Sequence, residues 1–326
     1  MKLIAIEEHY LTKEIRKEWE KHSDDPSHHN LNLGQTENRL DEIGSIRLQL
    51  MDETGIDVQV LSLTSPSFHN IGSKSVKLAI QTNDYISEIV KNTPNRFQGL
   101  AALPMTIPDE AVKELERTVN NLGFKGAMLC GRTCEKNIDH KDFWPLFECA
   151  ESLGVPLFIH PQIPQRGIRD IYYSGFDNQT DLAFSTYGIG WHYEAGVQFV
   201  RLVLSRVFDY FPNLQIILGH WGEVILFYID RLSSLSKTAK LDRPFIDYIR
   251  QNLYVTASGM YNQSCLKHAT DIIGIDRILF SSDYPYQYRQ GRDARNFLEG
   301  MELSENDREK IANGNWNKLC SVIKRA

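Results

Sequence analysis

Ionisable side chains gather at the end of the first apolar run of the sequence, IAIEEHYLT from residue 4 to residue 12. A buried strand does not normally end in two carboxylates and an imidazole, because each of these groups is costly to bury alone. Since side chains on a strand alternate between its two faces, Glu7 and His9 share one face and Glu8 lies on the other. We expect Glu7 and His9 to act together, and Glu8 to point outward into a helix interface or a salt bridge.

Other histidines and carboxylates occupy the same place after later apolar runs. His160 follows VPLFI, His220 follows LQIILG with Glu223 three residues later, and Asp283 follows RILFSS. Each alone has an ordinary structural explanation, since Asp283 could cap a helix and His220 could be a packing histidine. The joint pattern is harder to explain in that way, because every buried ionisable group needs a partner.

A metal ion would be such a partner. Two imidazole nitrogens and two carboxylate oxygens would come together from four residues: Glu7, His9, His160 and Asp283. This set suits Zn²⁺ or Mn²⁺, with Mg²⁺ as a further candidate, and leaves a coordination position open for water or substrate. The five cysteines are odd in number and contain no Cys-x-x-Cys pair, so we expect free thiols rather than a thiolate site. No GxGxxG or P-loop signature is present, so we expect no organic cofactor.

The elements that must position these residues alternate regularly. Eight apolar runs without polar alternation are typical of strands buried on both faces of a parallel sheet, at residues 2–9, 57–63, 97–105, 123–130, 155–161, 214–220, 253–259 and 277–285. Segments with helical signatures lie between them, including 45–55, 109–123, 142–154 and 194–212. The pattern predicts an α/β fold with a single (β/α)8 TIM barrel, in which active sites form at the carboxyl ends of the strands.

Two segments are too long to be plain loops between a strand and a helix. Residues 13–42 follow the first strand and are polar, whereas residues 162–193 follow the fifth strand and are rich in aromatic side chains. Long insertions at this end of a barrel usually form lids or pocket walls. No linker or low-complexity stretch interrupts the chain, so residues 1–326 are predicted to form one domain.

Composition excludes several classes of function. The chain has a formal net charge of −6, which argues against nucleic acid and anionic membrane surfaces as partners. It contains no run of eighteen apolar residues and no signal-peptide pattern at its start, so we expect no membrane span and a cytoplasmic location.

Three further residues are candidates to contact a substrate. His69 follows the second strand in the stretch TSPSFHN, and His192 lies at the end of the aromatic insertion. Trp191 precedes His192 and could stack on a substrate ring. The remaining histidines are expected to lie on the surface: His22, His28, His29, His140 and His268.

The motifs together resemble those of the amidohydrolase superfamily. The resemblance spans essentially the whole chain and is closest to the branch related to aminocarboxymuconate semialdehyde decarboxylase and γ-resorcylate (2,6-dihydroxybenzoate) decarboxylase. It is carried by AIEEHY (5–10), IHP (159–161), the block from residue 194 to residue 223, ASG (257–259) and LFSSDYPY (279–286). It implies that the four proposed ligands hold the metal and that the protein is a homodimer or homotetramer.

The same resemblance assigns roles to residues beside the metal. It implies that His220 is the active-site histidine and that Glu223 orients it. Arg231 matches an arginine of the central block, either contacting substrate or holding acidic groups near the site. A Glu-x-His opening is usual for the hydroxybenzoate decarboxylases, whereas hydrolases of the superfamily usually begin His-x-His. No lysine ends the fourth strand, which favours a site with one metal over two.

The sequence therefore favours a metal-dependent, non-oxidative decarboxylase of a hydroxylated aromatic acid such as a dihydroxybenzoate. In this interpretation a protonated Asp283 delivers a proton to the carbon that bears the carboxylate, and His220 contacts the phenolic oxygen or shuttles a proton. The alternative is a metal-dependent hydrolase or hydratase acting on a lactone, amide or unsaturated diacid, in which the metal activates a bound water. A non-enzymatic binding scaffold is disfavoured because every expected polar position is filled.

Overall fold

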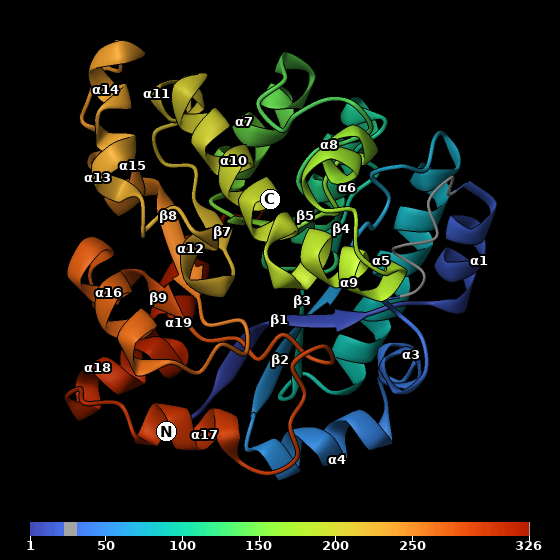
Figure 1. Ribbon diagram of the computed structural model, residues 1–326. Coiled ribbons are helices and arrows are strands. Elements are labelled where there is room, and N and C mark those ends of the chain that lie inside the picture. The colour runs from blue at the N-terminus through green and yellow to red at the C-terminus, as the bar shows by residue number, and fades with distance from the viewer. Residues whose placement is uncertain (23–30, 326) are drawn as a thin grey trace.

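Parallel strands form a closed barrel at the centre of the molecule and helices surround them (Figure 1). The computed structural model describes residues 1–22 and 31–325. The strands are β1 (Ile4–Tyr10), β2 (Val58–Leu63), β3 (Phe97–Gly99), β4 (Ala101–Ala102), β5 (Ala127–Leu129), β6 (Leu157–Ile159), β7 (Ile216–Leu218), β8 (Leu253–Thr256) and β9 (Ile278–Leu279). β3 and β4 are two parts of one barrel strand, interrupted only at Leu100.

The barrel closes between its first and last strands. The backbone N–H of Ile6 donates to Phe280 O at 3.0 Å, and that of His9 donates to Tyr284 O at 2.7 Å. The gap between the two sheets is bridged by Leu100, whose N–H donates to Leu61 O at 2.9 Å. The TIM barrel predicted from the alternating runs is confirmed.

Helices cover the outside of the barrel. The main ones are α4 (Ser45–Thr54), α5 (Lys74–Asn92), α6 (Pro108–Asn120), α7 (Trp144–Leu153), α10 (Gly190–Leu204), α11 (Val207–Tyr210), α15 (Phe245–Asn252), α16 (Gln263–Ile273), α17 (Asp293–Glu299), α18 (Glu305–Glu309) and α19 (Asn315–Ser321). The helix expected over 194–212 begins earlier, at Gly190, and breaks at Arg206, whose φ of 65° is left-handed. No helix in the described parts of the chain has the length and apolar character of a membrane span.

One extra residue in β1 changes which side chains face the barrel interior. Between Ala5 and Glu8 the strand advances three residues while its partner β2 advances only two, from Gln59 to Leu61, which is the signature of a β-bulge. Ile4 and Ile6 point inward below this irregularity, where they belong to the interior cluster described next. Simple alternation from Ile6 would put Glu8 inside, but the bulge shifts the phase so that Glu7 and His9 face the barrel instead.

Apolar side chains fill the lower part of the barrel. Alternate residues of the strands form one buried cluster: Ile4, Ile6, Val58, Val60, Leu100, Met128, Phe158, Ile217, Tyr254 and Leu279. Trp316 and Leu319 of α19 join the same cluster. The amino-terminal end of the barrel is therefore packed shut, which leaves the carboxyl ends of the strands as the place for a site.

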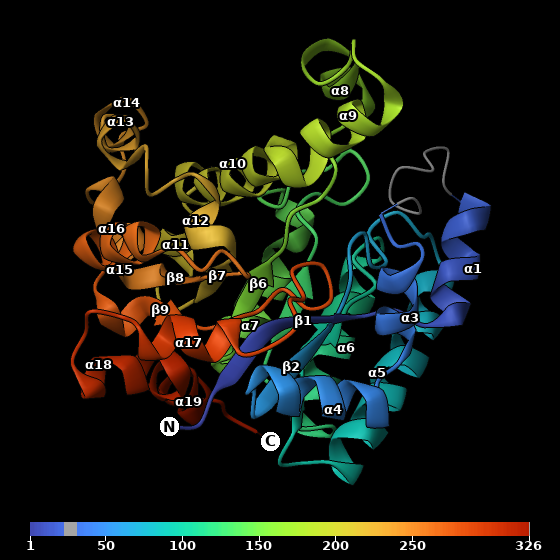
Figure 2. The same ribbon diagram turned by 60° about the horizontal axis from the view of Figure 1, so that its bottom comes forward.

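The two insertions lie at the carboxyl ends of the strands. The first contains α1 (Lys13–His22) and α3 (Gln35–Asp41), and the expectation for His28 and His29 lies outside the described residues. The second contains α8 (Arg166–Tyr172), α9 (Asn178–Ala183) and a π-helical turn at residues 184–188, and it projects from the barrel above α10 (Figure 2). The insertion ends directly at α10, so its last residues reach the barrel mouth.

Candidate metal centre and active site

Glu7 sits at the end of β1 with its carboxylate fully buried. Its Oε2 accepts a hydrogen bond from Ser258 Oγ and weaker ones from Thr256 Oγ1 at 3.4 Å and Ser281 Oγ at 3.5 Å. Those hydroxyls bond to one another, with Ser281 Oγ 2.7 Å and Ser258 Oγ 2.9 Å from Thr256 Oγ1. Three hydroxyls from β8 and from the segments that follow β8 and β9 thus fix one oxygen of Glu7, whereas Oε1 has no hydrogen-bond partner.

His160 follows β6 and presents one ring nitrogen to Glu7. Its Nδ1 donates to the carbonyl of Pro161 at 2.8 Å, which leaves Nε2 without a proton in the neutral ring. That Nε2 lies 3.6 Å from Glu7 Oε1. Burial, together with the nearby His9, lowers the pKa of His160 to about 3, so the ring is neutral and able to bind a metal near pH 7.

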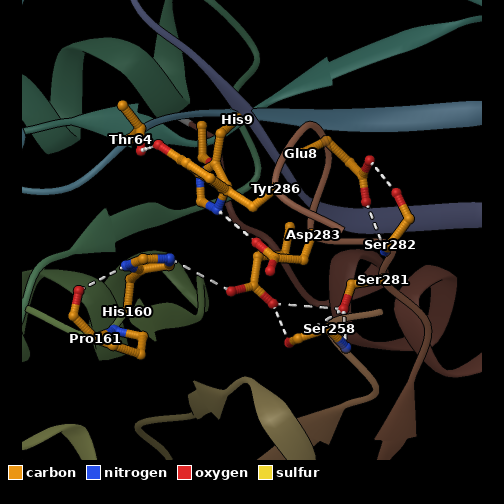
Figure 3. Close-up of polar contacts among 12 residues, drawn as sticks. Glu8, His9, Thr64, His160, Pro161, Ser258, Ser281, Ser282, Asp283 and Tyr286 are labelled. Carbon is orange, nitrogen blue, oxygen red and sulfur yellow. Dashed lines mark hydrogen bonds and ion pairs between the residues drawn. The ribbon is translucent and has the colours of Figure 1, made fainter. Parts of the chain in front are cut away.

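His9 stands edge-on to His160, with 4.7 Å between the ring centroids. Its Nδ1 lies 3.3 Å from Ser62 Oγ, and its Nε2 lies 3.4 Å from Asp283 Oδ1 (Figure 3). The ring is fully buried, yet Nε2 has no hydrogen-bond partner. Both nitrogens of His9 are therefore positioned, and the one facing Asp283 is unsatisfied.

These four residues could hold a metal ion. One ligand atom from each of Glu7, His9, His160 and Asp283 can be chosen so that all lie within 4.8 Å of one another, and all four residues are buried. Glu7 Oε1 and His9 Nε2 are buried atoms without hydrogen-bond partners, as expected where a cation would complete them. Two imidazoles with two carboxylates form a ligand set for Zn²⁺ or Mn²⁺.

Glu8 lies on the face of β1 opposite Glu7 and His9, as predicted from alternation over these three residues. Its carboxylate accepts hydrogen bonds from the backbone N–H of Ser282 at 2.8 Å, from Ser282 Oγ at 2.6 Å and from Gln59 Nε2 at 3.0 Å. Arg47 of α4, which donates to His9 O at 2.7 Å, adds a favourable positive charge. Glu8 is thus a structural residue at the interface between the barrel and its helices.

Asp283 connects the candidate metal site to a second group of ionisable residues. Its Oδ2 lies 3.8 Å from His220 Nε2, and its backbone has a left-handed φ of 57°. Burial alone would raise the pKa of Asp283, but the close imidazoles of His220 and His9 outweigh it and hold the pKa at about 2. The expectation from the sequence that Asp283 is protonated is therefore wrong, because its carboxylate is ionised near pH 7.

The nearby proton resides on His220 instead. Burial opposes a charge on this ring, but Glu223, Asp283 and Glu7 raise the pKa of His220 well above its ordinary value. His220 Nδ1 lies 2.7 Å from Glu223 Oε1, so Glu223 holds the ring as the family resemblance implied. The two histidine nitrogens thus face two carboxylates, Glu223 on one side and Asp283 on the other.

An unusual backbone brings His220 and Glu223 together. Residues 220–224 all have positive φ: 47° at His220, 59° at Trp221, 88° at Gly222, 50° at Glu223 and 65° at Val224. Each non-glycine residue in this region costs about 1–2 kcal/mol. The turn is held by Trp221 Nε1, which donates to Met260 O at 2.8 Å, and by the N–H of His220, which donates to Ser258 Oγ at 2.9 Å. Such strain is concentrated at functional sites.

A pocket of about 570 Å³ opens over Asp283, His160 and His220. Its lining is partly apolar and partly polar, with hydroxyl and amide groups from the first insertion and from the segments after β2 and β9. The apolar lining includes Leu31, Ile189, Trp191, Val224 and Met260, and the polar lining includes Asn32, Thr64, Tyr286 and Gln287. Tyr286 Oη donates to Asn32 Oδ1 at 2.5 Å and lies 2.6 Å from Thr64 Oγ1.

Two of the residues expected to contact substrate do lie at this pocket, and two do not. Trp191 and His192 line it. The expectation that His69 contacts substrate is wrong. Its Nε2 accepts the N–H of Cys130 at 3.0 Å, and its Nδ1 lies 2.9 Å from Thr133 Oγ1. His69 is therefore a buried structural residue outside the pocket lining. The expectation that Arg231 contacts substrate is also wrong, since it is exposed on α13 (Ile229–Ser233), outside the residues that line the pocket.

Comparisons with known proteins agree with this geometry. Residues 25–319 match the family model described as Amidohydrolase. The chain belongs to the amidohydrolase family. Among curated proteins, this amidohydrolase is 36% identical over 333 residues to the γ-resorcylate decarboxylase of Polaromonas sp. strain JS666, covering 98% of each chain.

Solved structures of similar amidohydrolases include metal complexes. A dihydroxybenzoic acid decarboxylase from Polaromonas sp. JS666, with bound manganese and the inhibitor 2-nitroresorcinol, is 33% identical with a TM-score of 0.84, covering 98% of this chain and 97% of that one. A 5-carboxyvanillate decarboxylase from Novosphingobium aromaticivorans, complexed with manganese and 4-hydroxy-3-methoxy-5-nitrobenzoic acid, is 26% identical with a TM-score of 0.90, covering 98% and 96%.

Metal binding should depend on the two β1 residues that face the barrel and not on the residue between them. We expect Glu7→Gln and His9→Gln each to weaken Mn²⁺ or Zn²⁺ binding by at least about 100-fold, because each removes a ligand. Glu8→Gln should leave metal affinity within about tenfold, although it lowers stability by disturbing the bonds to Ser282 and Gln59. Isothermal titration gives the affinities, and an equal loss in the Glu8 variant would contradict the assignment of faces.

Metal binding should also release a proton at pH 7. Burial raises the pKa of Glu7 to about 8, against the lowering influence of His220, so Glu7 holds a proton at pH 7 that the metal must displace. Apparent affinity should therefore fall by about tenfold per pH unit below pH 8 and level off above it. Titration in two buffers of different ionisation enthalpy measures the released proton. If wild type and Glu7→Gln release the same number of protons on binding the metal, Glu7 is not the group that loses the proton.

Proposed function

We propose that this amidohydrolase is a metal-dependent, non-oxidative decarboxylase of a hydroxylated aromatic acid, such as a dihydroxybenzoate. The observation that carries the proposal is that the carboxylate of Asp283 lies between His9 and His220. One of its oxygens lies 3.4 Å from the ligand nitrogen of His9, and the other lies 3.8 Å from His220 Nε2. A substrate held at the metal would thus lie beside the pair of residues that can supply a proton.

The charges of the pocket support a substrate with one carboxylate. Among the described residues that line the pocket there is no lysine or arginine. The positive partners of a substrate carboxylate would therefore be the metal and His220. A second carboxylate, as in an unsaturated diacid, would be buried there without a counter-charge, which disfavours the alternative of a diacid hydratase.

The walls of the pocket support a flat substrate that carries hydroxyl groups. Trp191 and Ile189 offer apolar surface to a ring. The indole N–H of Trp191 is buried and has no hydrogen-bond partner among the described residues, so it can donate to a substrate oxygen. Thr64, Tyr286 and Gln287, which also line the pocket, can exchange hydrogen bonds with phenolic hydroxyls.

The proposed mechanism uses the residues as follows. When bound, the metal supplies Lewis-acid chemistry toward the carboxylate and the adjacent phenolic oxygen of the substrate. His220 holds the proton at rest and passes it from Nε2 to Asp283 Oδ2, and Asp283 delivers it to the ring carbon that bears the carboxylate. The carbon–carbon bond then breaks, CO₂ leaves with the ring aromatic again, and one proton is taken up from solvent for each turnover. Glu223 keeps the His220 ring in place throughout.

The remaining properties are proposals of the same kind. We infer one divalent metal per chain, with Mn²⁺ or Zn²⁺ as the occupant, and no organic cofactor. Exposed aromatic side chains support a homodimer or homotetramer, since Phe227 is 74% and Tyr228 44% exposed with their rings 5.2 Å apart. The cytoplasmic location and the single domain spanning residues 1–326 stay predictions.

A substrate panel tests the proposed function directly. The protein loaded with Mn²⁺ or Zn²⁺ should decarboxylate at least one ortho-hydroxybenzoate, because only an ortho oxygen can share the metal with the carboxylate. Loss of ultraviolet absorbance of the acid measures turnover, and the corresponding meta-hydroxy acids serve as controls. Turnover of lactones or amides, with none of the ortho-hydroxy acids consumed, would favour the hydrolase instead.

Asp283 provides a second test. We expect Asp283→Asn to lower kcat by at least about 10³-fold, because the amide can neither take the proton from His220 nor deliver it. Some metal should remain bound, since three ligands and an amide oxygen are left, and elemental analysis measures it. Asp276→Asn is the matched control, because that carboxylate is exposed and forms an ion pair with Lys310. Activity near the wild-type level in Asp283→Asn would contradict the proton-transfer role.

A further inference from the structure

His192 bonds to the side of Glu223 that His220 leaves free. Its Nδ1 lies 2.7 Å from Glu223 Oε2, while His220 Nδ1 lies 2.7 Å from Glu223 Oε1. The two imidazole rings stand edge to face with 4.6 Å between their centroids. One fully buried carboxylate is thus clamped between two histidines that come from different parts of the chain.

The second hydrogen bond restricts rotation of the Glu223 carboxylate. The last torsion of a glutamate side chain has a broad, nearly two-fold energy profile, so a carboxylate held through one oxygen can rotate. A rotated carboxylate would no longer align Oε1 with His220 Nδ1, and the ring would swing its other nitrogen away from Asp283. A donor on Oε2 removes this freedom.

Two contacts fix His192 for this task. Its Nε2 lies 3.3 Å from the carbonyl oxygen of Tyr187, in the turn just before α10. One helical turn further along, a Cβ added at Gly196 would lie 2.4 Å from Glu223 O, so α10 lies directly against the left-handed turn of residues 220–224. The start of α10 and the turn that carries Glu223 are therefore held at a set distance.

We propose that His192 is a positioning residue for the decarboxylation, acting through Glu223 on His220. The inference rests on the proposed function and extends it to a residue outside the metal ligands. His192 fixes the plane of the Glu223 carboxylate, Glu223 fixes the ring of His220, and the ring directs Nε2 toward Asp283 and the substrate carbon.

A second metal ion is the competing occupant of this cluster, because ligand atoms of His192, His220 and Glu223 can be chosen within 4.8 Å of one another. The distances disfavour it. Each Nδ1 lies at hydrogen-bonding distance from its own carboxylate oxygen and so carries a proton, which excludes that nitrogen as a ligand. The number of metal ions per chain separates the two readings of the cluster.

Two substitutions at one position test the proposal. His192→Phe keeps the shape of the ring but removes the hydrogen bond to Glu223, whereas His192→Asn places an amide N–H near the position of Nδ1. We expect His192→Phe to lower kcat by about 10–100-fold with KM changed less than about threefold, and His192→Asn to recover kcat to within about fivefold of wild type. Bound metal should remain at one ion per chain in both.

Other outcomes would overturn the proposal. A wild-type kcat in His192→Phe, or an equal loss in both variants, would remove the positioning role. A rise in KM alone would make His192 a substrate contact, and a fall from two metal ions to one would make it a ligand. His192→Ala replaces the Phe variant if that protein does not fold.

A readout independent of turnover separates this proposal from the proposed function. In protein with ¹⁵N-labelled histidine, the Nδ1–H of His220 bonded to Glu223 should give a downfield proton resonance in wild type and in His192→Asn. The resonance should broaden or disappear in His192→Phe. If wild type consumes no hydroxybenzoate, the function fails while this comparison still decides the role of His192, and an unchanged resonance in His192→Phe would refute it.

Discussion

Glu7 places a carboxylate where water cannot reach it, and the arrangement of the barrel mouth follows from the need to balance that charge. Three hydroxyls satisfy one of its oxygens, but hydrogen bonds from neutral groups cannot supply a positive charge. The penalty for an unpaired buried carboxylate is several kcal/mol. His160 offers a neutral nitrogen rather than a cation, and burial outweighs the charge of His220, so Glu7 must hold a proton or share a metal. The affinity for the metal and the burial of its ligands are two aspects of the same electrostatic requirement.

The site separates two kinds of carboxylate by their neighbours. Glu7 is surrounded by hydroxyls and has a pKa raised to about 8 by burial, whereas Glu223 is clamped by two imidazoles whose charges overcome burial and lower its pKa to about 2. Asp283 lies between them, 3.4 Å from His9 Nε2 and 3.8 Å from His220 Nε2. A carboxylate in that position meets the requirements of the two roles proposed for it, those of metal ligand and proton carrier.

The fold and much of the candidate site could be predicted from the sequence, and the physical reasons also explain which parts could not. The barrel and the clustering of Glu7, His9, His160 and Asp283 follow from local rules, namely apolar runs and the residues that end them. His69 obeys the same rules, yet it is occupied by Cys130 and Thr133. Arg231 was assigned from the family resemblance, yet it is exposed, and both outcomes depend on packing that no local rule describes. The left-handed turn at residues 220–224 was equally hidden, because four of its five residues are not glycine and disfavour that conformation.

The bulge in β1 separates two tasks that a regular strand would combine. Toward the start of β1, Ile4 and Ile6 point into the apolar interior of the barrel. Toward its end, the alternation is shifted by one residue, so that Glu7 and His9 face the barrel mouth. A change of residue type at position 7 therefore alters the chemistry of the barrel mouth without disturbing the layer of side chains beneath.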